Sequence, residues 1–378
     1  MKKQAKFILL CFCLLFLSGC GDRLSVEETT LSLVYALDID EKGKLTVYQL
    51  NPVFNKEAKN KYEVHSAKVT TNRQARQVFD SMMNGTITTG KVQVIMFSEH
   101  LLRKQGIMAL IDSIYRDPKN SGNTCLVVVK GPIAPLMNSK FNDKPILPMY
   151  IKNVIDVGRD SNQGVFVTAQ HFHKLAFDKG ITPFITEIKT GPKALTITGS
   201  ALLDNGGIYK LSLNRHESAL LLMLQKSEHP PVSFTMRMPS FSFKTPNPLQ
   251  NKKGTDFISV DVYKVKRKIS VTHEHNHFSF MVQLEMNVDL TERTFDMNLD
   301  KNKEQLEAIL TKQFTKELNS LVRKIQKKQL DPFGFGWHVR AYLYPEWKKV
   351  EEHWPLEFSK ANVSIIPVVK IQKNGVIE

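Results

Sequence analysis

The segment from Phe278 to Leu290 constrains the fold more than any other part of the chain. Its apolar residues occupy every second position, and polar residues fill most of the positions between them. This period of two predicts a long β-strand with one face on a core. In the strand before it, Ile258, Val260 and Val262 share one parity, whereas the later apolar residues take the other. The change of phase predicts a β-bulge near residue 262.

The change of phase also fixes where three lysines lie. Lys264, Lys266 and Lys268 fall together on the face opposite the apolar residues, which we expect to be solvated. A second basic group ends the helix predicted over residues 303–328, whose apolar residues recur every three or four positions. This group consists of Arg323, Lys324, Lys327 and Lys328. Both groups are candidate surfaces for an acidic partner, and the alternative is an ordinary solvated surface.

The segment after this helix reads as a turn followed by the last elements of the C-terminal domain. It runs Asp331-Pro332-Phe333-Gly334-Phe335-Gly336, and its glycines allow backbone angles that other residues resist. We expect a strand over 338–342, a short helix over 347–354 and a final strand over 363–371. Together these elements predict a long amphipathic helix packed on an antiparallel sheet. The residues assigned to the structural turn, or to contact with a partner, are Asp331, Gly334, Gly336, Trp347 and Trp354.

The N-terminus has the parts of a lipoprotein signal peptide. Three early lysines precede an apolar run over residues 7–17, which is too short to span about 30 Å of hydrocarbon. The run ends in Leu17-Ser18-Gly19-Cys20, the pattern of a lipobox. We therefore expect removal of residues 1–19 and attachment of a diacylglyceryl group, with an N-acyl chain such as palmitate, to Cys20. The alternative is a plain secretory signal with an incidental cysteine.

We expect the mature chain to be a lipid-anchored ectodomain outside the cytoplasm. Lys and Arg number 52 against 37 acidic residues, a formal charge of +15. Because such an ectodomain meets no nucleic acid, this charge favours anionic lipid or an acidic protein as partner.

Strands and helices alternate irregularly, which predicts an α+β fold of three mixed α/β-sheet domains. The expected boundaries are an N-terminal domain over 20–180, a middle domain over 181–254 and a C-terminal domain over 255–378.

No catalytic or metal-binding constellation is recognisable in the sequence. Nucleophile-elbow, P-loop, zincin and dinucleotide-binding motifs are absent. Three of the four cysteines lie within residues 1–20, so Cys125 stands alone and neither a disulfide nor a structural zinc site is expected. His273, His275 and His277 share one face of an extended segment; we interpret them as an exposed polar turn, with adventitious metal as the alternative. We therefore expect no enzyme activity, no metal and no cofactor.

Several motifs follow one another in order over nearly the whole chain. After the lipobox come Lys91-Val92-Gln93-Val94-Ile95, Ser98-Glu99-His100-Leu101 and Arg116-Asp117-Pro118. The turn segment 331–336, then Tyr344-Pro345-Glu346-Trp347-Lys348 and Trp354, complete the series. In these motifs and their order, the chain resembles the Ger(x)C, or GerAC-like, lipoproteins, which are the C subunits of spore germinant receptors.

The resemblance implies a three-domain α+β ectodomain on the outer face of the inner spore membrane. It also implies two multi-spanning partners, the A and B subunits of the same nutrient receptor, and a non-catalytic role in receptor assembly or signalling during germination. A solute-binding lipoprotein is the main alternative. Its two lobes would show repeated parallel βαβ units, which we do not expect from the irregular pattern here. A cell-wall enzyme would need convergent acids or a metal triad.

Overall fold

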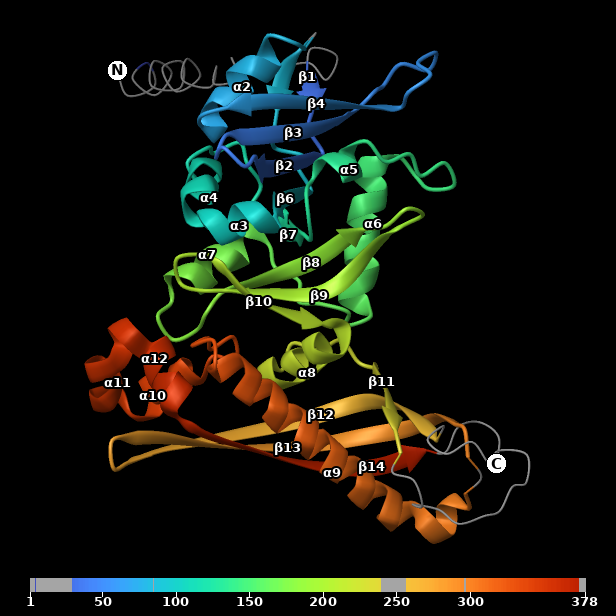
Figure 1. Cartoon of the computed structure of the whole chain (residues 1–378), viewed down its shortest axis with the longest axis vertical. Coiled ribbons are helices and arrows are strands. Elements are labelled where there is room, and N and C mark those ends of the chain that lie inside the picture. The colour runs from blue at the N-terminus through green and yellow to red at the C-terminus, as the bar shows by residue number, and fades with distance from the viewer. Residues whose placement is uncertain (1–3, 5–28, 84, 239–255, 296, 374–378) are drawn as a thin grey trace.

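The computed structural model describes residue 4 and residues 29–83, 85–238, 256–295 and 297–373. Two large sheets are stacked along the long axis of the molecule, with helices around and between them (Figure 1). A small third sheet pairs β1 (Thr29–Leu31) in parallel with β5 (Thr86–Thr88). Apart from residue 4, the predicted signal peptide lies outside the described residues, as does Cys20, so lipidation stays a prediction.

The larger sheet has eight strands, and its centre is parallel. In spatial order they are β10 (Tyr209–Asn214), β9 (Leu195–Leu203), β8 (Phe184–Thr190), β7 (Cys125–Val129), β6 (Val94–Ser98), β2 (Val34–Ile39), β3 (Leu45–Pro52) and β4 (Tyr62–Val69). Strands β2, β6, β7 and β8 run parallel, and antiparallel strands extend the sheet on both sides. The expected lack of parallel units is therefore wrong for this sheet, although all four parallel strands belong to one sheet rather than to two lobes.

Helices cover both faces of this sheet, and its central strands are buried on both sides. The helices on one face are α2 (Asn72–Asp80), α3 (Glu99–Lys104), α4 (Met108–Tyr115) and α7 (Ala169–Phe177). The helices on the other face are α5 (Ala134–Met137) and α6 (Leu147–Asp160). Along β6, Ile95 and Phe97 point to the first group, whereas Val94 and Met96 point to the second. Burial on both faces is the usual environment of parallel strands.

The expected domain boundary at residue 181 does not separate two sheets. Strand β8 pairs with β7, and β9 and β10 extend the same sheet. Just after this boundary the pairing changes from parallel, between β7 and β8, to antiparallel, between β8 and β9. The other internal boundary, at residue 254, lies outside the described residues.

The second sheet is mixed rather than wholly antiparallel. Its strands, in order, are β11 (Val232–Arg237), β12 (Phe257–Glu274), β13 (His277–Arg293) and β14 (Asn362–Lys373). The first three pair antiparallel as expected, but β14 runs parallel to β13. A parallel neighbour needs a long crossover connection, because a tight turn reverses the chain.

Helices supply that crossover, and they correct one predicted strand. The chain passes from α9 (Leu299–Gln326) through α10 (Phe335–Tyr342), α11 (Tyr344–Val350) and α12 (Trp354–Lys360) before it enters β14. The strand predicted over 338–342 is therefore wrong, because these residues belong to α10. The long helix is confirmed, and it begins at Leu299 rather than at residue 303, with the Asn298 side chain accepting a hydrogen bond from the backbone of Lys301.

Helix α9 also closes the free edge of the sheet. The backbone N–H groups of β14 that point away from β13 belong to alternate residues, among them Ile365, Val369 and Ile371. They donate to Asn319 Oδ1 at 3.1 Å, Thr311 Oγ1 at 3.1 Å and Glu307 Oε1 at 2.7 Å, respectively. Pro367 occupies the outward position between Ile365 and Val369 and has no N–H to offer.

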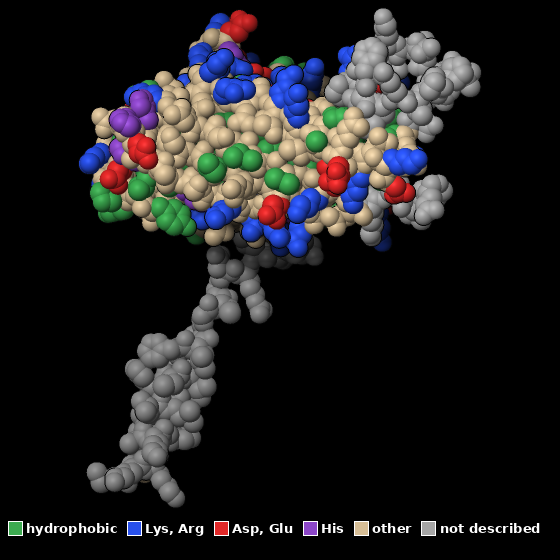
Figure 2. All heavy atoms as spheres, turned by 90° about the horizontal axis from the view of Figure 1, so that it is seen from below, with side chains coloured by type: hydrophobic (Ala, Val, Ile, Leu, Met, Phe, Trp, Pro, Cys, Tyr) green, Lys and Arg blue, Asp and Glu red, His purple; other side chains and the backbone are tan. Residues whose placement is uncertain are grey.

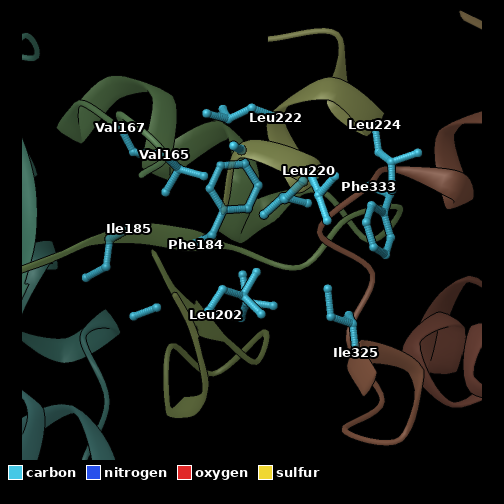
Figure 3. Close-up of a cluster of buried hydrophobic side chains, with 14 of the residues drawn as sticks. Val165, Val167, Phe184, Ile185, Leu202, Leu220, Leu222, Leu224, Ile325 and Phe333 are labelled. Carbon is cyan, nitrogen blue, oxygen red and sulfur yellow. The ribbon is translucent and has the colours of Figure 1, made fainter. Parts of the chain in front are cut away.

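One buried helix joins the two large sheets. In α8 (Arg215–Gln225), every residue from Ser218 to Leu224 is buried, and a helix that is buried on all sides lies inside a core. Figure 3 shows Leu220, Leu222 and Leu224 of this helix between Phe184 of the larger sheet and Phe333 of the C-terminal part. The hydrophobic core is thus continuous from one sheet to the other.

This continuous core predicts that the two sheets unfold together. Leu221→Ala removes a side chain with no exposed surface and is expected to lower the free energy of unfolding by about 2–5 kcal/mol. Urea denaturation followed by circular dichroism should show one transition, shifted as a whole. Leu356→Ala in α12, where the side chain is 39% exposed, serves as the control and should change little. Two separate transitions in the Leu221→Ala protein would contradict the continuous core.

Candidate interaction surface

The outer face of the C-terminal sheet displays side chains in rows that cross three strands. Pairing between β12, β13 and β14 sets the rows, because residues in register on neighbouring strands point to the same face. The rows are Lys264 with Asn287 and Lys370, Lys266 with Glu285 and Val368, Lys268 with Gln283 and Ile366, and Ser270 with Met281 and Ser364. We call these residues the outer face.

A bulge in β12 brings the lysines into these rows. Val262 pairs with Val288 and Lys264 pairs with Asn287, so Tyr263 is an extra residue without a partner in the ladder. The predicted bulge is therefore confirmed. After it, even-numbered residues of β12 point outward, and Lys264, Lys266 and Lys268 are all exposed.

The outer face has an apolar centre between charged side chains. Met281 is 46% exposed, Ile366 41% and Val368 43%. Figure 2 views this end of the molecule from below and shows hydrophobic side chains in the middle, with Lys and Arg side chains toward the margins. Lys266 Nζ lies 3.4 Å from Glu285 Oε2, but both side chains are well exposed, and such a pair contributes about 0–1 kcal/mol. An apolar centre with a polar rim is typical of a protein interface.

The second basic group divides between the surface and an internal contact. Arg323, Lys327 and Lys328 are exposed. Lys324 Nζ, however, lies 2.7 Å from Glu217 Oε1 and so links α9 to α8. Because α9 covers the inner side of the sheet, this group does not join the lysines of the outer face.

The predicted turn forms around one buried carboxylate. Asp331 has no exposed surface; its Oδ1 accepts a hydrogen bond from Gly334 N at 3.0 Å, and its Oδ2 accepts from Gly336 N at 2.9 Å and Trp354 Nε1 at 2.8 Å. Burial raises the pKa of Asp331 to about 6. The hydrogen bonds act in the opposite direction, because they favour the charged form, but burial has the larger effect. The Asp331 carbonyl also accepts from the backbone of Thr182, which precedes β8.

Close packing explains the two glycines and places the two tryptophans inside. Gly334 has a φ of +78°, and a Cβ on Gly336 would lie 2.6 Å from the Cα of Gly180. Trp347 is 1% exposed and Trp354 fully buried, with their rings 5.5 Å apart. The segment is therefore placed to hold the C-terminal part against the larger sheet, and these two tryptophans offer no surface to a partner.

The histidine-rich segment is the tip of the hairpin between β12 and β13. His275 and Asn276 form a two-residue turn, with φ values of 50° and 61°. The predicted exposed turn is thus confirmed. Within the part of the chain that the structure describes, no group of three His, Cys, Asp or Glu residues is arranged to hold a metal ion.

Sequence reasoning missed Arg267, which lies on the inner face of the sheet. It pairs with Leu284 in the β12–β13 ladder, and its guanidinium donates to the carbonyl of Leu224 at the end of α8. The available signal was parity, because Arg267 shares the odd-numbered positions of Val265, Ile269 and Val271 in the apolar set.

Comparisons with known proteins give one consistent result. The chain matches the family described as "Spore germination protein N-terminal domain" over residues 22–190 and "Spore germination B3/GerAC like, C-terminal" over residues 198–375. It is 21% identical to spore germination protein GerQC of Bacillus cereus and 24% identical to spore germination protein B3 of Bacillus subtilis, in each case over all of both chains. The crystal structure of the GerBC protein has a similar fold, with a TM-score of 0.57, 17% identity and coverage of 89% of this chain and 96% of that one.

No described helix is long and apolar enough to cross a membrane.

The environment of Asp331 predicts a pH-dependent difference between the protein and its Asp331→Asn variant. At pH 7 the variant should be less stable by about 2–3 kcal/mol, because its amide presents a donor to groups that also donate. The folded pKa of about 6 lies above the unfolded value of about 4, so Asp331 adds stability below pH 4 that is lost as the pH rises through 6.

Urea denaturation between pH 4 and pH 7 measures this difference. Relative to the variant, the unmodified protein should gain up to about 3 kcal/mol on going from pH 7 to pH 4. A difference between the two proteins that stays constant over this range would show that Asp331 does not titrate there.

Proposed function

Because the chain belongs to the GerAC-like family of spore germination proteins, we propose that it is the lipoprotein C subunit of a nutrient germinant receptor. The observation that supports this role most directly is the match of both family models, which together extend from residue 22 to residue 375. In this role the chain is anchored through Cys20 on the outer face of the inner spore membrane. It assembles with the multi-spanning A and B subunits and takes part in assembly or signalling.

We propose the outer face as the contact with the membrane subunits. Its exposed Met281, Ile366 and Val368 supply apolar area, and the lysines beside them select an acidic segment of a partner. Salt screens exposed charges over roughly 8–10 Å, so the charges tune the association while the apolar centre supplies most of the affinity.

We expect no catalysis, metal or cofactor to be needed for this role, and stoichiometric zinc that is lost on His273→Ala would contradict that expectation.

The anchor can be tested with Cys20→Ala. The variant lacks the thiol that receives the diacylglyceryl group, so it should leave the membrane fraction when cells are lysed and fractionated. Serine substitution of Cys125, which is buried in β7, is the matched control and should leave the protein in the membrane pellet. Full retention of Cys20→Ala would show that protein contacts suffice to hold the chain at the membrane.

The contact surface can be tested by reversing charge on one face. Replacing Lys264, Lys266 and Lys268 together by Glu should leave the melting temperature unchanged, because their side chains point away from the core. Recovery of the A and B subunits with the tagged protein should fall severalfold, and germination should slow.

A matched control replaces Lys56, Lys59 and Lys61, which are exposed in the loop between β3 and β4 at the opposite end of the molecule, by Glu (Figure 1). This variant carries the same change of charge and should retain the membrane subunits. An equal loss in both variants would indicate a general charge effect, and normal recovery with the first variant would exclude the outer face as the contact.

A further inference from the structure

A cavity of about 270 Å³ lies where the larger sheet, the end of α8 and the C-terminal part meet. Phe184 of β8, Leu222 of α8 and Phe333 of the turn segment form apolar walls, and Figure 3 shows these three side chains coming from separate parts of the fold. The volume suits a ligand on the order of ten non-hydrogen atoms. Neither the outer face nor the membrane anchor includes this cavity.

The polar lining of the cavity is basic. Beside the uncharged Gln225 and Ser227 it contains five basic residues, two arginines and three histidines, and none of the described residues that line the cavity is Asp or Glu. The residues are Arg159, Arg267, His171, His229 and His338. Burial lowers the pKa of His171 and of His338, which favours their neutral forms, whereas the two arginines carry a permanent positive charge.

Of the two arginines, Arg267 has the less neutralised charge. Arg159 stacks on the ring of Phe166 at 4.9 Å and donates to Asp160 at 2.9 Å. Arg267 gives one N–H to the Leu224 carbonyl, and no carboxylate among the described residues lies within ion-pair distance of it. Glu228 acts on Arg267 through its charge alone, without an ion-pair contact among the described residues, and burial raises the pKa of the Glu228 carboxyl.

A second lining residue also has an unused donor. The indole Nε1–H of Trp337 is buried and has no hydrogen-bond partner in the described structure. A buried donor without a partner is unusual in a folded protein, and a ligand that accepts from it removes this deficiency. Both Arg267 and Trp337 are donors only, so the complementary group is an acceptor that carries negative charge.

We propose that this cavity binds a small organic carboxylate with an apolar body, the carboxylate lying against Arg267 and Trp337 and the body against the phenylalanine walls. One buried guanidinium matches one carboxylate in charge and in hydrogen-bonding geometry. The aromatic and aliphatic walls select a branched or aromatic body. Because the walls come from both halves of the chain, the ligand stabilises the arrangement in which the two sheets are joined.

Binding can be measured by calorimetry and by thermal shift on the full-length chain in detergent. The probes are 3-phenylpropionate, indole-3-acetate and 4-methylpentanoate, each paired with its neutral amide. At least one carboxylate should bind saturably and raise the melting temperature, and its amide should bind at least about tenfold more weakly. Arg267→Met should weaken carboxylate binding by a similar factor, whereas Arg116→Met, in an exposed arginine that does not line the cavity, should not.

A second variant covers the case in which Arg267→Met does not fold. Ser227 is exposed and lines the cavity, so Ser227→Trp fills the space without disturbing the core. It should keep the melting temperature of the unliganded protein and lose the response to the carboxylate. The proposal is overturned if none of the three carboxylates binds, if the amides bind equally well, or if Ser227→Trp binds as tightly as the unmodified chain.

Discussion

A single buried carboxylate sets the direction in which the chain leaves its longest helix. Asp331 accepts hydrogen bonds from the start of α10 and from Trp354 of α12, and its own carbonyl accepts one from Thr182 beside the larger sheet. The crossover that makes β14 parallel to β13 passes through this point. That crossover therefore sets the order of residues on the outer face. It also sets where the two halves of the chain meet around the cavity.

The bulge at Tyr263 gives one strand two different chemical faces. Beyond it, the lysines of β12 point to solvent, while Arg267 points inward among apolar residues and reaches α8. Without the extra residue, both sets would exchange faces, because side chains alternate along a strand. The proposed protein contact and the proposed ligand site are therefore products of the same local irregularity.

The sequence predicts the features that depend on local periodicity and misses those that depend on how distant segments meet. Alternation over 278–290, the phase change near 262 and the apolar stripe of α9 are local, and the structure confirms all three. Apolar and polar residues alternate in the same way along a parallel and an antiparallel strand, so the direction of β14 could not be predicted. The α10 helix depends on the buried Asp331, which no periodicity reveals.

The larger sheet and the cavity show the same limit. The sequence predicts a domain boundary at residue 181, but whether a sheet ends there depends on the pairing of β8 with β7, which lies more than fifty residues earlier in the chain. Arg159, Arg267 and Trp337 reach the cavity from three separate regions. The anchor at Cys20 is different in kind: it is a short linear motif, and it stays a prediction.

The hydrogen bonds between β14 and α9 limit how another chain can pair with this edge of the sheet. Side chains of α9 accept hydrogen bonds from the outward backbone N–H groups of Ile365, Val369 and Ile371, and Pro367 has no backbone N–H. An added strand from another copy would find no row of free donors along this stretch. Neighbouring copies of the chain are thereby protected from edge-to-edge polymerisation along β14, and recognition at this edge is left to side chains, which can change by substitution without altering the backbone.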